Sequence, residues 1–269
     1  MLPDCHMHTS FSGDCKIEPE IMIETAISKG LCTITLTDHL DIDYPNEPDL
    51  FMLDLEKYAK TVHTLKEKYR DEIELLYGIE IGLQPHLANK HHEIANLYDF
   101  DYIIGSSHVV HGQDPYYPEF FEGRSELSAF REYFESVLEN ITVFDDFDSY
   151  GHLDYVVRYS PSKKASYDCY EELPELIDEI LRLLVSKNKA LEVNTGAFKY
   201  NQKSPNPTAS IIRRYLELGG KYITCGADAH KPENISDHFD EIENSLRGTN
   251  LEYITVFKKR TPMLIPLVP

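Results

Sequence analysis

The chain has few basic residues, no cysteine pair at zinc-finger spacing and no long apolar run. Its 26 Lys plus Arg against 46 Asp plus Glu give a formal net charge of −20, which disfavours an extended grip on nucleic-acid phosphates. The five cysteines show no CxxC spacing, so we expect neither a zinc finger nor a disulfide framework, and a reducing cytoplasm fits best. No stretch approaches the ~20 apolar residues of a membrane span, and the opening MLPDCHMHTS is not a signal peptide. We therefore expect no membrane partner.

Short β-rich runs alternate with helix-like segments, which indicates repeated βα units and a parallel sheet in one domain over residues 1–269. The expected strands are 2–7, 32–37, 74–80, 101–106, 148–152, 189–194, 221–226 and 252–257. The expected helices are 18–29, 51–70, 125–142, 169–187, 207–219 and 238–247. Two longer loops, 40–50 and 109–124, are either binding walls above the strand ends or exposed connections stiffened by proline.

Histidine and carboxylate side chains follow the C-terminal ends of these strands, where an α/β barrel places its chemistry. Nine of them are candidate metal ligands: His6, His8, Asp14, His39, Glu80, His108, His152, Asp228 and His230. Residues two apart on a strand point to the same side, so a pair such as His6 and His8 can bind one ion. A single histidine would be better explained as a structural residue, and Asp14 as a turn or cap. The collective placement of six of the 12 histidines at successive strand ends favours ligands.

The mixture of imidazole and carboxylate groups suits zinc, iron or manganese, whereas calcium takes nearly all its ligands as oxygen. Nine ligands are too many for one tetrahedral ion, but they suffice for three ions that share a bridging carboxylate and a water. Glu80, in GIEIG, has two oxygens that can bridge two cations, and its flanking glycines allow close backbone approach. A water held by such ions ionises near neutral pH and becomes a nucleophile. The pattern therefore predicts a multinuclear metallohydrolase.

The order of these motifs resembles that of the polymerase and histidinol phosphatase (PHP) superfamily. The family pattern is present as HMH, FSGD, TDH, GIEIG, GSSH, YGH and GADAH. The strings HVVHGQDPYYPEFFEGR, YGHLDYVVRY and LEVNTGAFK resemble in particular the free-standing histidinol-phosphate phosphatases of that superfamily. The resemblance implies an α/β fold, a distorted (β/α)7 barrel of the PHP type, in which 252–257 is either a closing or a peripheral strand.

The resemblance also implies a site with three divalent transition-metal ions, Zn, Fe or Mn. It places His6, His8, Glu80 and Asp228 on the first ion, Glu80, His108 and His152 on the second, and Asp14, His39 and His230 on the third. Glu80 would be the bridge, and we assign the catalytic role to Glu80, Asp228 and His230.

Two basic residues are the candidate phosphate contacts. Arg158 stands six residues beyond His152, and its planar guanidinium matches phosphate oxygens. Lys199 follows LEVNTGAF, at a position where related phosphatases often have arginine, so the sequence departs from the family there. A basic residue chosen blindly would be a solvated surface group, but the strand-end location favours a functional role.

These features predict a phosphoric monoester hydrolase that converts L-histidinol phosphate to L-histidinol and phosphate in histidine biosynthesis. The expected partner is a small-molecule phosphate monoester. One alternative is a PHP phosphoesterase for another small phosphate or a nucleotide, and a second is a noncatalytic, metal-bound or polymerase-associated module. Asp38 and Asp154 are candidates for the general acid. The amine and imidazole of the substrate are expected to meet loop residues Asp41, Asp43, Tyr44, Tyr116, Tyr117, Glu119, Phe120 and Phe121.

Overall fold

A curled parallel sheet forms the centre of the computed structural model, which describes residues 1–163 and 167–267. In this part of the chain the sheet has seven strands in the order β1-β3-β4-β5-β6-β7, with β2 paired to β3 beyond the end of β1. These strands are β1 (Thr33–Leu36), β2 (His39–Leu40), β3 (Glu74–Gly82), β4 (Tyr102–Ser106), β5 (Ser149–Tyr150), β6 (Ala190–Asn194) and β7 (Ile223–Gly226). All their pairings are parallel, so their C-terminal ends share one edge.

The N-terminal segment 4–8 lies between the first and last strands of this sheet. On one side Thr35 N donates to Asp4 O at 3.0 Å, and on the other Cys5 N donates to Cys225 O at 2.9 Å. The regular strand expected here is wrong, because the hydrogen bonds are shared between two neighbours and leave only isolated bridges. The segment still joins β7 to β1, and the predicted distorted α/β barrel is confirmed.

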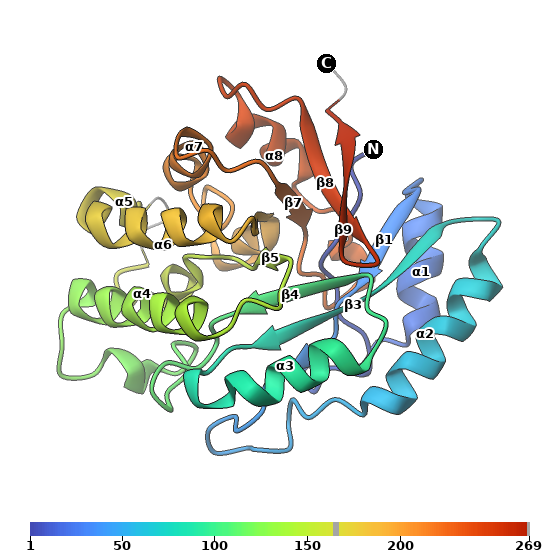
Figure 1. Ribbon diagram of the computed structural model, residues 1–269, viewed down its shortest axis with the longest axis horizontal. Helices are drawn as coiled ribbons and strands as arrows, with labels where there is room; N and C mark the ends of the chain where they lie inside the picture. Colours follow the sequence, from blue (N-terminus) through green and yellow to red (C-terminus); the bar gives the residue numbers. More distant parts are fainter. Residues whose placement is uncertain (164–166, 268–269) are drawn as a thin grey trace.

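The helices surround the strands, with α1 and α2 on the opposite side of the molecule from α4, α6 and α7 (Figure 1). The α-helices are α1 (Pro19–Ser28), α2 (Leu55–Tyr69), α3 (Ala88–Leu97), α4 (Glu126–Val143), α5 (Cys169–Glu172), α6 (Pro174–Ser186), α7 (Ala209–Glu217) and α8 (Phe239–Leu246). Short 3-10 turns lie between them: η1 (Pro85–Leu87), η2 (Pro118–Phe121), η3 (Tyr155–Tyr159), η4 (Thr195–Tyr200) and η5 (Pro232–Asn234).

Two helix predictions need correction. The single helix expected over 169–187 is two helices, because Pro174 has no N–H to donate and its ring forces Leu173 out of helical geometry, to φ −132°. Helix α3 was not expected at all. It buries only His91, Ile94 and Ala95, so its sequence lacks the apolar repeat that marks an amphipathic helix.

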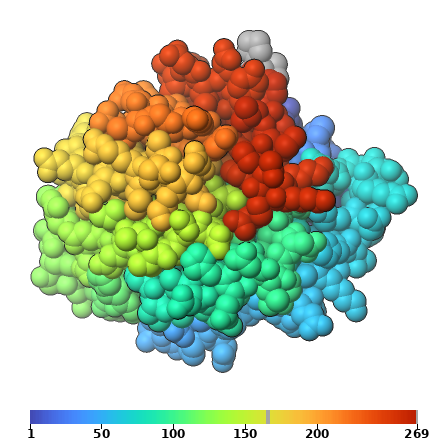
Figure 2. Space-filling view, in the orientation of Figure 1, coloured from blue at the N-terminus to red at the C-terminus, as the bar shows by residue number. Residues whose placement is uncertain are grey.

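The C-terminal residues form an antiparallel hairpin outside the barrel, β8 (Tyr253–Lys258) with β9 (Thr261–Pro266). Val256 and Phe257 of the hairpin pack with Leu76, Tyr102 and Ala190 near the starts of β3, β4 and β6. The predicted strand at the C-terminus is therefore peripheral and covers the N-terminal end of the barrel. In Figure 2 the same segment, in red, lies at the molecular surface.

The barrel interior changes from apolar to polar along its axis. Near the hairpin, the Tyr102 hydroxyl donates to Thr224 Oγ1 at 3.1 Å, and because β4 and β7 are not neighbours this bond crosses the interior. Side chains two residues apart share a face, so the inward positions further along these strands include Glu80, Ser106 and Glu192. All three are fully buried. The polar end of the barrel thus lies at the C-terminal ends of the strands.

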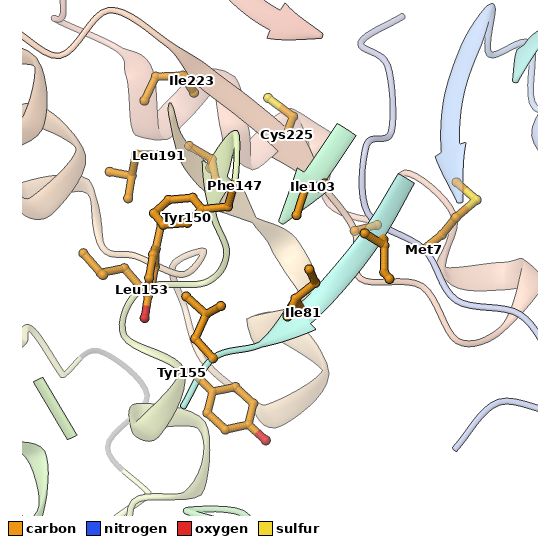
Figure 3. Close-up of a cluster of buried hydrophobic side chains, with 14 of the residues drawn as sticks. Met7, Ile81, Ile103, Phe147, Tyr150, Leu153, Tyr155, Leu191, Ile223 and Cys225 are labelled. Carbon is orange, nitrogen blue, oxygen red and sulfur yellow. The ribbon is translucent and has the colours of Figure 1, made fainter. Parts of the chain in front are cut away.

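The opposite faces of the strands carry the main apolar core. Ile81, Ile103, Leu191 and Ile223 are fully buried and point into one cluster with Tyr150 (Figure 3). Burying each such side chain stabilises the fold by about 1.5–3 kcal/mol. This packing gives the strand ends a rigid base on which the polar residues are positioned.

Candidate metal centre

All nine predicted ligands lie together at the C-terminal ends of the strands. They come from segment 4–8, the loop that follows it, β2, β3 and the turns after β4, β5 and β7. Seven of the nine are buried, whereas His230 is half-buried and Asp14 is exposed. The βα repeat therefore brings to one place groups that are more than two hundred residues apart in sequence.

The first group consists of His6, His8, Glu80 and Asp228. His6 Nε2 lies 3.1 Å from His8 Nε2 and 3.2 Å from Glu80 Oε2. Asp228 Oδ1 lies 3.4 Å from His8 Nε2 and 3.9 Å from His6 Nε2. A tetrahedral ion with ligands at about 2.0–2.1 Å separates neighbouring ligand atoms by about 3.3 Å. The four side chains can hold such an ion with small adjustments.

The second group consists of Glu80, His108 and His152. Glu80 Oε1 lies 2.9 Å from His152 Nε2 and 3.3 Å from His108 Nε2, and the two imidazole nitrogens are 3.4 Å apart. The two oxygens of Glu80 therefore face different groups of ligand atoms, as a bridging carboxylate requires. Ser106 steadies this carboxylate by donating its hydroxyl to Oε1 at 2.6 Å.

The third group consists of Asp14, His39 and His230. Asp14 Oδ2 lies 3.0 Å from His230 Nε2 and 3.9 Å from His39 Nε2. His230 Nε2 is buried and has no hydrogen-bond partner in residues 1–163 and 167–267, although Asp14 is close. The two groups approach each other without the angles of a hydrogen bond, which is the arrangement expected of two ligands that face a common cation.

The outer nitrogens of two of the histidine rings, those of His6 and His108, bind carboxylates, as is usual for metal-ligating histidines. His6 Nδ1 lies 2.7 Å from Glu192 Oε1, and His108 Nδ1 lies 2.7 Å from Asp41 Oδ1. These contacts turn the Nε2 atoms of both rings toward the centre. Sequence reasoning did not find Glu192. Its signal was a carboxylate at an inward position of a buried strand, which needs a partner.

Neighbouring carboxylates and imidazoles in the centre shift one another's pKa values. Burial alone would lower the pKa of His6, but the carboxylates of Glu192 and Glu80 outweigh it and raise that pKa well above its usual value. Burial likewise opposes ionisation of Glu80, yet neighbouring His6 and His39 lower its pKa well below the ordinary range. Burial, with His39 next to it, lowers the pKa of His8, so this ring stays neutral. The carboxylate of Glu80 is therefore surrounded by imidazole groups that favour its ionised form.

Two of the candidate ligands have a strained backbone conformation. His152 has φ 22° and Asp228 has φ 53°, values that residues other than glycine rarely adopt. The His152 N–H is held by Glu192 Oε2 at 2.9 Å. At Gly226, next to this region, a Cβ atom would overlap His6. The chain therefore accepts local strain and close contacts to aim these side chains.

A cavity of about 610 Å³ opens onto the centre. The loop 40–50 contributes Tyr44, and the loop 109–124 contributes Asp114, Tyr116 and Tyr117 to its wall. Both long loops thus line the space beside the candidate ligands. The cavity is large enough for a small-molecule ligand.

The other loop residues proposed from the sequence lie in different places. Asp41 lines the cavity but binds His108, as described above. Asp43 lies 3.0 Å from the exposed His86 ring, outside the cavity lining. Glu119 is exposed outside that lining, and Phe120 and Phe121 are buried in the core.

Arg158 and Lys199 both line the cavity. Three nitrogens of Arg158 donate to Asp228 Oδ2 at 2.9 Å, Asn206 Oδ1 at 2.7 Å and Asn194 Oδ1 at 2.8 Å. A guanidinium has five N–H groups, so about two remain available to a ligand. Lys199 Nζ donates to the Asp228 carbonyl at 2.6 Å. The two cations are therefore anchored beside the centre.

The two candidates for the general acid do not line the cavity described above. Asp38 accepts hydrogen bonds from Thr9 N at 2.6 Å and from the Ser12 hydroxyl at 2.8 Å. Asp154 accepts from Asn206 Nδ2 at 2.5 Å, and burial raises its pKa to about 7. Both carboxylates support the loops of the site, and Asp154 does so by holding the amide that binds Arg158.

The profile of the PHP domain matches residues 4–196, more than half of the chain. The chain therefore belongs to the PHP family. A "Probable histidinol-phosphatase" of Clostridium acetobutylicum is 32% identical over 260 residues, covering 97% of this chain and 98% of that protein. The histidinol-phosphatase of Lactococcus lactis is 34% identical over 228 residues, covering 84% and 83% of the two chains.

A solved structure gives a similar result. The crystal structure of histidinol phosphate phosphatase from Lactococcus lactis, complexed with zinc, L-histidinol and phosphate, matches with a TM-score of 0.90. The sequences are 29% identical, and the match covers 97% of this chain and 98% of the other.

Within the described residues, no helix has both the length and the apolar character needed to span a membrane.

Proposed function

We propose that this PHP-family protein hydrolyses L-histidinol phosphate to L-histidinol and phosphate, as a phosphoric monoester hydrolase of histidine biosynthesis. The observation that carries the proposal is the convergence of nine ligand-type side chains, Arg158 and Lys199 beside one cavity. The zinc, L-histidinol and phosphate complex of the Lactococcus lactis enzyme supports the choice of substrate.

The donor set fits divalent transition-metal ions, because it combines imidazole nitrogens with carboxylate oxygens. We infer three ions, of zinc, iron or manganese. The holding residues would be His6, His8, Glu80 and Asp228 for the first, Glu80, His108 and His152 for the second, and Asp14, His39 and His230 for the third. When bound, such ions lower the pKa of a water ligand and stabilise charge on phosphoryl oxygens.

The protein's own residues contribute positioning and fixed charge. Arg158 is held on three sides, so its remaining N–H groups can bind phosphate oxygens without further ordering of the side chain. We assign two roles to Asp228, metal ligation and the positioning of Arg158. Its Oδ1 faces the histidines, and its Oδ2 accepts a hydrogen bond from Arg158. Glu192 and Asp41 keep His6 and His108 in the orientation that ligation requires.

The test of this function is substrate preference. Contacts with phosphate are common to all phosphate monoesters, so discrimination must come from the rest of the ligand. We expect kcat/KM for histidinol phosphate to exceed that for aryl and sugar phosphates by at least ~100-fold, or about 2.7 kcal/mol of transition-state binding. All substrates are assayed with the same metal loading. Equal kcat/KM values across the panel would leave a general phosphoesterase and refute the specific function.

Lys199→Ala should lower kcat/KM for histidinol phosphate by about 3- to 30-fold. We expect a smaller effect than for Arg158, because this ammonium already donates to the Asp228 carbonyl and is held by a single hydrogen bond. Lys199→Arg should recover most of the activity. Lys203→Ala, an exposed lysine nearby in sequence, is the matched control. Wild-type kcat/KM in Lys199→Ala would remove this residue from phosphate binding.

A further inference from the structure

One carboxylate in the cavity wall, that of Asp114, belongs to none of the candidate metal groups. Asp14 and Asp228 are among the candidate ligands, and Asp41 is bound to His108 at 2.7 Å. Asp114 lines the same cavity from the loop 109–124 and is only 5% exposed. Its role is not explained by the metal centre.

The hydrogen bonds of Asp114 come from neutral groups. Tyr44 Oη donates to Oδ2 at 2.7 Å, and Tyr116 N donates to Oδ1 at 2.7 Å. In residues 1–163 and 167–267 no lysine, arginine or histidine forms an ion pair with it within 4.0 Å. A carboxylate has about four lone-pair sites, so roughly two remain. A buried anion with spare acceptor capacity and no cation is stabilised by a cationic ligand.

The position of Asp114 matches the chemistry of an amino-alcohol phosphate. Asp114 and the candidate ligands His108 and His152 line the same cavity. In L-histidinol phosphate the carbon that carries the ammonium is bonded directly to the ester methylene. An ammonium so close to the phosphoryl group needs an anionic partner beside the metal centre, and not one at the cavity mouth.

We propose that Asp114 binds the ammonium group of the substrate and thereby determines specificity for phosphate esters of 2-amino alcohols. The proposal rests on the proposed function and adds a residue to it. Tyr44 holds the carboxylate in place, and the same hydrogen bond joins the two long loops in the cavity wall. Tyr44 and Tyr116 also line this cavity, and aromatic side chains favour bound cations.

The test compares esters that differ only in the ammonium group. For the wild-type enzyme we expect kcat/KM for 2-aminoethyl phosphate to exceed that for ethyl phosphate by about 10- to 100-fold, the usual effect of a charge-assisted hydrogen bond. Asp114→Asn should abolish this preference and lower kcat/KM for histidinol phosphate by a similar factor. Activity on ethyl and 4-nitrophenyl phosphate, and the metal content, should stay within about 3-fold of wild type.

Two further variants make the test decisive. Asp114→Ser removes the carboxylate but keeps an acceptor for the Tyr116 N–H, so it replaces Asp114→Asn if that variant fails to fold. Glu119→Gln removes a charge from the same loop outside the cavity lining and should behave as wild type.

The outcomes separate this inference from the proposed function. A variant that keeps the ammonium preference, or that loses activity equally on all esters, overturns the role of Asp114 while histidinol-phosphate hydrolysis stands. A different pair of results would support the role of Asp114 and refute histidinol phosphate as the specific substrate. In that case the wild-type enzyme does not prefer histidinol phosphate to aryl phosphates, but it prefers esters with an ammonium group and Asp114→Asn loses this preference. A wild-type enzyme without any ammonium preference overturns the inference.

Discussion

Glu80→Gln should lower kcat/KM for phosphate-ester hydrolysis by at least about 10³-fold, or about 4 kcal/mol. The amide retains the size of the side chain but replaces one ligand oxygen with an NH2 group that cannot bind a cation. Both oxygens of Glu80 face candidate ligands, Oε2 toward His6 at 3.2 Å and Oε1 toward His152 at 2.9 Å. The substitution should therefore also lower the metal content, measured by elemental analysis of the purified protein.

The matched control for this prediction is Glu74→Gln. Glu74 begins the same strand, is partly exposed and pairs with Lys258, at the end of the barrel away from the centre. The Glu74→Gln variant should retain wild-type metal content and turnover, because an exposed ion pair contributes only about 0–1 kcal/mol to stability. If Glu80→Gln also kept both quantities, the proposed bridge would be wrong. Removal of metal from the wild-type protein by a chelator should reproduce the loss of activity.

Arg158→Ala should lower kcat/KM for histidinol phosphate by about 30- to 1,000-fold, which corresponds to about 2–4 kcal/mol for one preorganised charged donor. The guanidinium is buried, and three hydrogen bonds fix its position in the cavity wall. Because Arg158 Nη1 also donates to Asp228 Oδ2, the assay is run at saturating metal and the metal content is measured in parallel. Loss of activity at full metal content identifies a phosphate contact.

Two variants test the interpretation of Arg158. Arg158→Lys keeps the charge but cannot reproduce the three hydrogen bonds in one plane, so we expect only partial recovery. Arg182→Ala removes a surface arginine paired with Asp178 and should be neutral for turnover. An unchanged kcat/KM in Arg158→Ala would show that phosphate binds elsewhere.

The sequence predicted the barrel because most βα units carry their own local signal, an apolar run followed by an amphipathic repeat, which only α3 clearly lacks among the longer helices of the described residues. It was wrong where neighbours from elsewhere decide the structure. Segment 4–8 has the composition of a strand, but it shares its hydrogen bonds between β1 and β7 and forms only isolated bridges. Residues 253–258 do form a strand, and only packing against the starts of β3, β4 and β6 places it outside the barrel.

The candidate site shows the same difference between what local sequence predicts and what contacts with distant residues decide. The ligands could be proposed from sequence because parallel strands bring their C-terminal ends to one edge, so chemical type and strand position together imply proximity. The supporting residues could not, since Glu192 meets His6 across 186 positions of sequence and Asp41 meets His108 across 67. Asp114 was missed for a related reason. A loop aspartate normally caps a turn, as this one does for Tyr116, and only its burial in the cavity wall distinguishes it.

By itself, the sequence determined the chemistry that this protein can perform: which side chains can ligate metal, and the βα order that brings them to one edge. Tertiary structure alone decided how those groups are used, because the direction of a side chain depends on contacts made across the barrel. The two oxygens of Glu80 face different ligand groups only after the barrel closes, and Arg158 becomes a fixed donor only when Asn194, Asn206 and Asp228 surround it. Residue type follows from the chain, whereas orientation and charge environment follow from the fold.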